Sequence, residues 1–134
     1  MILAAALILS LPAVAVAQID PARRAAGLTL ARSVRSKAYA LAESAQLFKG
    51  AFTQELAKNP DIAQLEAEYP GVTAAMIDAA RPLIERLIVK SLPSLWNVMA
   101  DIYASAMTVA EIEQARTYYE SSPGRRFLEL TIEN

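Results

Sequence analysis

The chain has 134 residues, of which 54% are hydrophobic, with 13 Lys/Arg against 14 Asp/Glu and neither cysteine nor histidine. The formal net charge of −1 argues against a dedicated nucleic-acid-binding protein. The absence of cysteine and histidine excludes disulfides, thiol nucleophiles and the usual zinc sites, and it removes the commonest general base. The length suits a single domain, in which we find no motif for a catalytic residue, a metal ligand or a cofactor.

Residues 1–17 have the pattern of a signal peptide. They contain no charged side chain, and Ala15 and Ala17 provide small residues at −3 and −1 of a cleavage site before Gln18. The segment departs from the usual pattern because no Lys or Arg precedes the apolar stretch. We expect cleavage after Ala17 and export to the periplasm. The alternative is an uncleaved inner-membrane anchor, for which 17 residues are at the lower limit of length.

The first helix is expected to begin at Asp20-Pro21, where the aspartate can cap free N–H groups, and to end at Asn59-Pro60. Gly50 is expected to break or bend it. Its apolar positions recur at spacings of three and four, which predicts a seam whose small residues allow close helix packing. We interpret the seam as part of the core, and an intermolecular coiled coil is the alternative. The seam consists of Gly27, Ala31, Val34, Ala38, Leu41, Ala45, Phe48 and Phe52.

A short helix is expected over 61–69, ended by Pro70-Gly71, and the longest helix is expected to start at Thr73. Pro82 and Pro93 predict a boundary or a kink in it. The opposite side of this helix is polar. The predicted core face consists of Met76, Ala80, Leu83, Leu87, Leu92, Leu95, Met99, Ile102 and Ala106.

A capping box formed by Thr108 and Glu111 predicts a helix start, which Met107 and Ile112 support as a hydrophobic staple. This helix is expected to reach about residue 120. A last helix follows, with Ser122 as N-cap and Pro123 at its first position. The sequence therefore predicts an all-α, single-domain bundle of about five helices over residues 18–134.

The C-terminal part resembles a family of exported bacterial proteins known as domain of unknown function 2059. The resemblance rests on Asp101-Ile102-Tyr103, the capping box, and the run from Tyr118-Tyr119 through Ser122-Pro123-Gly124 to Arg125-Arg126, and it covers about residues 73–130. The proline stands one position later than in the family pattern. Family members also tend to continue with another helical stretch, so a missing final helix is an expectation here. The resemblance implies an envelope location and an all-helical fold, and it implies no activity.

An interaction surface is a hypothesis for this C-terminal motif, because aromatic residues with a polar tip are favoured at interfaces. Its residues are Tyr118, Tyr119, Gly124, Arg125 and Arg126. The alternative is that one tyrosine packs in the core, the glycine permits a turn and the arginines are solvated. A second basic stretch, which suggests contact with anionic lipid or merely a solvated face, contains Arg23, Arg24, Arg32, Arg35 and Lys37.

The leading functional hypothesis is a non-enzymatic periplasmic protein that acts through contacts with a protein partner or with its own copies. The alternative is a carrier of an apolar ligand or lipid, using a cavity beside residues 83–107 that Trp96, Met99 and Tyr103 would line, although core packing is the commoner role of such residues. An envelope hydrolase ranks below both, because Glu111 and Glu113 cannot share a helical face.

Overall fold

The computed structural model describes residues 18–133 and contains six α-helices and no strand within that range. The all-α prediction is confirmed, with six helices in place of about five. The predicted signal peptide, residues 1–17, lies outside the described residues. The helices are α1 (Pro21–Val34), α2 (Lys37–Ala57), α3 (Pro60–Glu68), α4 (Val72–Ala106), α5 (Val109–Glu120) and α6 (Ser122–Glu133).

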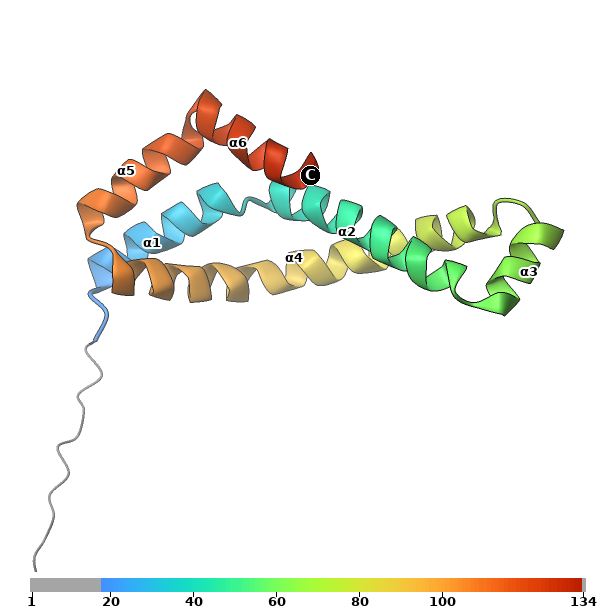
Figure 1. Ribbon diagram of the computed structural model, residues 1–134. Helices are drawn as coiled ribbons and strands as arrows, with labels where there is room; N and C mark the ends of the chain where they lie inside the picture. The colour runs from blue at the N-terminus through green and yellow to red at the C-terminus, as the bar shows by residue number, and fades with distance from the viewer. Residues whose placement is uncertain (1–17, 134) are drawn as a thin grey trace, which may run out of the picture.

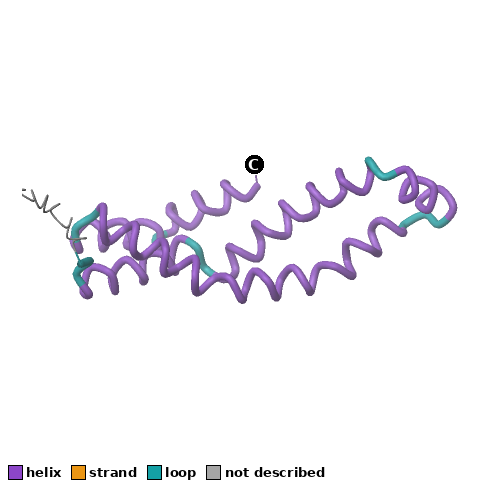
Figure 2. Tube along the Cα trace, turned by 90° about the horizontal axis from the view of Figure 1, so that it is seen from below, coloured by secondary structure: helices purple, strands orange, loops and turns teal. Residues whose placement is uncertain are grey.

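The molecule is an elongated hairpin of helices with an extra layer at one end (Figure 1). The chain runs out along α1 and α2, turns through α3 at the far end and returns along α4 (Figure 2). The side chain of Arg24 bonds Asp101, and Trp96 bonds the carbonyl of Arg35, so α1 and α4 are antiparallel. At the other end of the chain, α5 and α6 run back over α1 and the start of α2 (Figure 1).

Small residues bring α1 and α4 into close contact. Gly27 and Ala31 of α1 and Ala100 and Ala104 of α4 are all buried. A Cβ atom on Gly27 would lie 2.7 Å from the carbonyl oxygen of Ala100. The prediction that small seam residues allow close packing is thus confirmed for Gly27 and Ala31. Farther along the predicted seam, Ala38 is exposed.

The predicted helix over 20–58 is wrong in one respect, because it is divided between Val34 and Lys37. Ser36 adopts extended backbone angles, and its hydroxyl accepts a hydrogen bond from the N–H of Tyr39 as the N-cap of α2. Gly50 lies inside α2 without breaking it. A side-chain cap therefore starts a new helix here, whereas an exposed glycine within a helix is tolerated.

A second serine cap divides α5 from α6. Ser121 has extended backbone angles, and its hydroxyl accepts a hydrogen bond from the N–H of Gly124 at 3.2 Å. The predicted cap at Ser122 is wrong by one residue, since Ser122 is already the first residue of α6. By contrast, the predicted capping box of Thr108 and Glu111 is confirmed, with bonds in both directions.

The long helix α4 contains Pro82 and Pro93 in its interior, so a helix boundary at these residues is wrong, while the alternative of a kink stays a prediction. Each proline removes one backbone donor, but α1 and α2 pack along this helix and stabilise its continuous form. The predicted core face is also wrong in part. Leu83, Leu87 and Ile102 are more than half exposed, and the fully buried positions nearby are small ones. Near Ile102 the reason is that Gly27 and Ala31 of α1 pack against the small residues Ala100 and Ala104 on another side of α4.

The turn between α3 and α4 is closed by a side chain from α3. Gly71 has a left-handed φ of 96°, which glycine adopts without strain. The carboxylate of Glu66 accepts hydrogen bonds from the N–H groups of Gly71 at 2.7 Å and Thr73 at 2.9 Å. These bonds stabilise the charged form and lower the pKa of Glu66. Glu66 therefore caps the N-terminus of α4, whose N-cap residue, Gly71, has no side chain.

The buried core lies mainly at the end of the molecule where α1, α4 and α5 meet, and it also includes Ala40 near the start of α2. Leu30 and Ile112 are its largest fully buried side chains. Between Ala40 and Leu92 no residue is buried, and this stretch includes α3 and most of α2. The far end is therefore a thin arm whose apolar side chains remain partly in contact with solvent.

Candidate functional site

Two helix breaks face each other and leave a cleft between them. The break between α1 and α2 lies opposite the break between α5 and α6, so that α5 and α6 form an arch over α1 and the start of α2 (Figure 1). The cleft has a volume of about 450 Å³, and we call it the junction cleft. It is lined by Ser33, Ser36, Ala38, Tyr39, Ala42, Tyr119, Glu120, Arg125, Leu128, Glu129 and Ile132.

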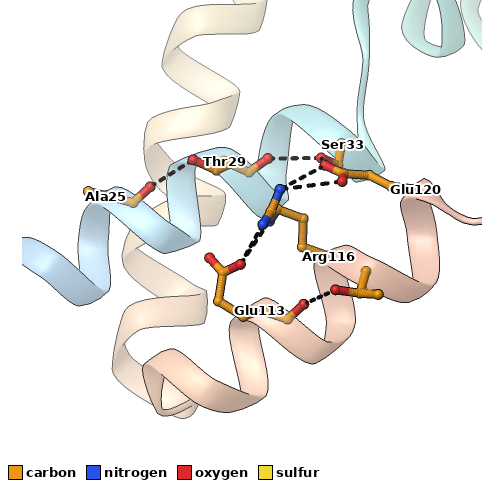
Figure 3. Close-up of polar contacts among 7 residues, drawn as sticks. Ala25, Thr29, Ser33, Glu113, Arg116 and Glu120 are labelled. Carbon is orange, nitrogen blue, oxygen red and sulfur yellow. Dashed lines mark hydrogen bonds and ion pairs between the residues drawn. The ribbon is translucent and has the colours of Figure 1, made fainter.

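Polar contacts hold the arch in place on both sides of the cleft. On the α5 side, the hydroxyl of Ser33 donates to Glu120 at 2.8 Å, and Arg116 binds Glu120 and Glu113 (Figure 3). These two glutamates raise the pKa of Arg116. On the α6 side, the hydroxyls of Tyr39 and Thr131 lie 2.9 Å apart. The cleft walls are thus fixed by contacts between segments far apart in the sequence.

The structure brings some residues of the predicted interaction surface together and separates others. Tyr119 and Arg125 both line the junction cleft. Tyr118 is 48% exposed and meets the ring of Tyr119 edge to face at 5.2 Å. Arg126 forms ion pairs with Glu129 and Glu133 on its own helix, and these carboxylates raise its pKa. The motif therefore divides between the cleft and the solvent-exposed surface.

Gly124 determines how closely α6 approaches the end of α5. It is buried, and a Cβ atom at this position would lie 1.9 Å from the carbonyl oxygen of Tyr118. No side chain fits in that distance. Its role is close backbone approach rather than an unusual backbone angle, since the positive-φ glycine among the described residues is Gly71.

The charges that line the cleft are unequally neutralised. Glu120 is bound by Arg116 and Ser33, and Glu129 is bound by Arg126. Within residues 18–133, the guanidinium of Arg125 has no carboxylate within ion-pair distance. Arg125 is therefore the cation of this cleft whose charge remains available.

Four of the five residues in the N-terminal basic stretch have partners within the fold. Arg24 pairs with Asp101 at 2.6 Å, and Arg35 pairs with Glu43. The guanidinium of Arg32 lies over the ring of Trp96. Arg23 donates to the carbonyl of Ala104 at 3.3 Å. These arginines therefore stabilise the packing of α1 against its neighbours, a structural role that the sequence pattern did not predict.

The aromatic residues that were candidates for an apolar cavity on the long helix lie against neighbouring helices, Trp96 at the end of α1 and Tyr103 near Tyr119 of α5. Trp96 is half-buried, and its Nε1 donates to the carbonyl of Arg35 at 2.7 Å. Tyr103 is half-buried as well, and burial together with the nearby Tyr119 raises its pKa. Both residues therefore contribute to helix packing. The surface hollow on this helix is lined by Val98, Asp101, Ile102, Ser105 and Ala106.

A row of exposed apolar side chains follows the long helix. At 3.6 residues per turn its members fall within about one third of the helix circumference. Their exposed fractions are 56% for Leu83, 61% for Leu87, 37% for Leu95, 56% for Val98 and 58% for Ile102. We call this row, with the exposed Ser91 and Ser94 between its two halves, the outer face of α4. The sequence did indicate these leucines, but as core.

Ser33, Ser36 and Tyr39 of the junction cleft were not identified from the sequence, because the segment was interpreted as one continuous helix. The serine cap at position 36 is the local signal that marks the break. Across residues 18–133 no helix is long and apolar enough to cross a membrane. No group of three acidic side chains suited to a metal ion occurs in the same range.

The comparisons with known proteins agree with the sequence resemblance. Residues 95–133 match the family described as "Uncharacterized protein conserved in bacteria (DUF2059)". The predicted resemblance of the C-terminal part to this family is therefore confirmed, and the match covers the end of α4 with α5 and α6. No curated protein and no solved structure matches the chain significantly.

Proposed function

We propose that this chain is an exported, non-enzymatic protein of the bacterial envelope that acts through protein contacts. The contact surface is the outer face of α4, and its occupant is the same face of a second copy. The observation that carries this proposal is the row of large apolar side chains, four of which are more than 55% exposed: Leu83 and Leu87 on one pair of consecutive turns, and Val98 and Ile102 on another. Single exposed apolar residues are ordinary, but aligned ones are typical of interaction sites.

The spacing along the outer face supports pairing with a second copy. Leu83, Leu87 and Ser91 are separated by steps of four, and so are Ser94, Val98 and Ile102. Two antiparallel copies of α4, related by a two-fold axis between positions 92 and 93, would match Leu83 with Ile102 and Leu87 with Val98. A two-fold interface requires this kind of self-complementary pattern.

The middle of the row suits a close crossing of two helices. Ser91 and Ser94 are exposed and would lie on either side of the two-fold axis. Their small side chains allow the helix backbones to approach, while the larger apolar residues above and below exclude water. The thin arm between Ala40 and Leu92, which has no buried residue, would gain cover from the partner.

The test is the molecular mass of the protein in solution, measured by sedimentation equilibrium over a range of concentrations. We expect a monomer–dimer equilibrium. Leu87→Glu should weaken dimerisation by more than about 100-fold, because the symmetric contact would bury two unpaired carboxylates. Leu47→Glu is the matched control, since Leu47 is 67% exposed on α2 and lies outside the outer face. A wild-type monomer at all concentrations, or equal effects of both variants, would overturn the proposal.

The register can be tested by cross-linking because the chain has no cysteine. A mixture of the single variants Ser91→Cys and Ser94→Cys should form mixed disulfide dimers faster than either variant alone. Equal rates in the three samples would refute the two-fold arrangement.

Export is proposed on the pattern of residues 1–17. Mass spectrometry of the protein from a bacterial envelope fraction should find a mature chain that begins at Gln18. An uncleaved chain in the membrane fraction would support the anchored alternative, and an uncleaved chain in the cytosol would overturn export.

A further inference from the structure

The junction cleft has the size and the lining of a small-molecule site. We propose that it binds a single-chain amphiphile with a carboxylate head, of the kind represented by a fatty acid. Its volume of about 450 Å³ lies within the range of about 300–1,000 Å³ that ligand pockets occupy. This site is distinct from the outer face of α4, and the inference does not depend on dimerisation.

An unpaired arginine in the cleft selects an anionic head group. Glu120 and Glu129 also line the cleft, but each is bound by an arginine: Glu120 by Arg116, which also binds Glu113, and Glu129 by Arg126, which also binds Glu133. Arg125 lines the same cleft and has no carboxylate partner among residues 18–133. Its planar guanidinium can hold a carboxylate through two parallel hydrogen bonds. A ligand with a single negative charge therefore complements the one cation that the fold leaves unpaired here.

The apolar lining continues away from Arg125 along two helices. Leu128 and Ile132 follow Arg125 on α6 at spacings of three and four, so the three residues share one face of that helix. Ala38 and Ala42 form a similar row on α2. The helices α2 and α6 run in the same direction (Figure 1). The two rows therefore form the apolar part of the cleft lining, which we call the channel.

The small side chains of α2 leave the space that a hydrocarbon chain would fill. Ala38 and Ala42 are both exposed, whereas Leu128 and Ile132 opposite them are half-buried. The hydroxyl oxygens of Tyr39 and Thr131 lie 2.9 Å apart. This hydrogen bond fixes the distance between α2 and α6 at this point. The channel is therefore held open by a contact that does not require the ligand.

The experiment is isothermal titration calorimetry of the mature chain with dodecanoate, below the concentration at which this probe forms micelles. Arg125→Gln should weaken binding by about tenfold or more, because a charge-assisted pair is lost. Arg81→Gln is the matched control: the same change removes a guanidinium that pairs with Asp78 on α4 and does not line the junction cleft. It should leave the affinity unchanged.

Two further measurements locate the head and the tail. Dodecanol, which has the same chain without the charge, should bind the wild type about tenfold more weakly than dodecanoate and should bind Arg125→Gln with unchanged affinity. Ala38→Leu should fill the channel and abolish binding while the circular dichroism spectrum stays helical. The proposal is overturned if dodecanoate does not bind, if the two arginine variants behave alike, or if Ala38→Leu binds as the wild type does.

Discussion

Two glycines in helix interiors should respond in opposite ways to the same substitution. Gly27 lies within α1 against α4, where a Cβ atom would be 2.7 Å from the carbonyl oxygen and 3.3 Å from the Cα atom of Ala100. Gly50 lies within α2, where a Cβ atom would have no neighbour within 4 Å. Replacing either glycine by alanine therefore changes the helix propensity equally, but only Gly27→Ala forces two backbones apart.

The expected magnitudes follow from these distances. Alanine favours the helix over glycine by about 1 kcal/mol, so Gly50→Ala should stabilise the protein by about that amount. Overpacking of a close contact costs about 1–3 kcal/mol. Gly27→Ala should therefore be up to about 2 kcal/mol less stable than the wild type and about 1–3 kcal/mol less stable than Gly50→Ala.

The free energies of unfolding can be measured by urea denaturation followed by far-ultraviolet circular dichroism. The comparison between the two variants is the decisive quantity, because the propensity gain cancels between them. If Gly27→Ala were as stable as Gly50→Ala, the close approach of α1 and α4 at this position would be refuted.

Three other substitutions test separate parts of the structure. Gly124→Ala should lower the free energy of unfolding by about 3 kcal/mol, because its Cβ atom would lie 1.9 Å from the carbonyl oxygen of Tyr118; a urea midpoint equal to that of the wild type would contradict the arrangement of α5 and α6. The hydrogen bonds that Thr108 donates to Glu111 lower the pKa of Glu111 in the folded state. The stability that this carboxylate contributes is therefore fully present above its unfolded-state pKa of about 4.3, and it is lost as the pH falls through the folded-state pKa. Glu111→Gln keeps a capping acceptor without titrating, and its melting temperature should fall less steeply in acid than that of the wild type; parallel pH profiles would show that the cap does not depend on charge. Trp96→Phe should cost about 1–2 kcal/mol in urea denaturation, because it removes the 2.7 Å bond to the carbonyl of Arg35 and weakens the cation–π contact with Arg32. An unchanged midpoint would argue against that link between α1 and α4.

Local chemistry in the sequence was sufficient to predict the helical class and several helix ends. Asp20 caps α1 as predicted, Asn59-Pro60 marks the predicted end of the preceding helix, and Thr108 with Glu111 forms the predicted capping box. Each of these signals acts over three residues or fewer, through a side chain and a nearby N–H group, and so it does not depend on the rest of the fold. The family resemblance of the C-terminal part was likewise available from residue order alone.

Tertiary structure decided which apolar residues became core and which residues met in a cleft. The long helix carries large apolar residues on one side and small ones on another, and periodicity cannot choose between them. Gly27 and Ala31 selected the small side around Ala100, which left Ile102 exposed, and the packing of α2 farther along left Leu83 and Leu87 exposed. The reason is that packing depends on the shape of the partner helix, which no local pattern contains.

The junction cleft depended on tertiary structure for the same reason. Its walls come from α1 and α2 on one side and from α5 and α6 on the other, about 80 or more residues away along the chain, as the bond between Ser33 and Glu120 illustrates. The sequence by itself determined that helices break near Ser36 and Ser121 through their caps, although only the second break was recognised. The two breaks lie opposite each other because α1 and α2 pair antiparallel with α4, and because α5 and α6 return over them. Long-range packing therefore decides where helix ends meet in space.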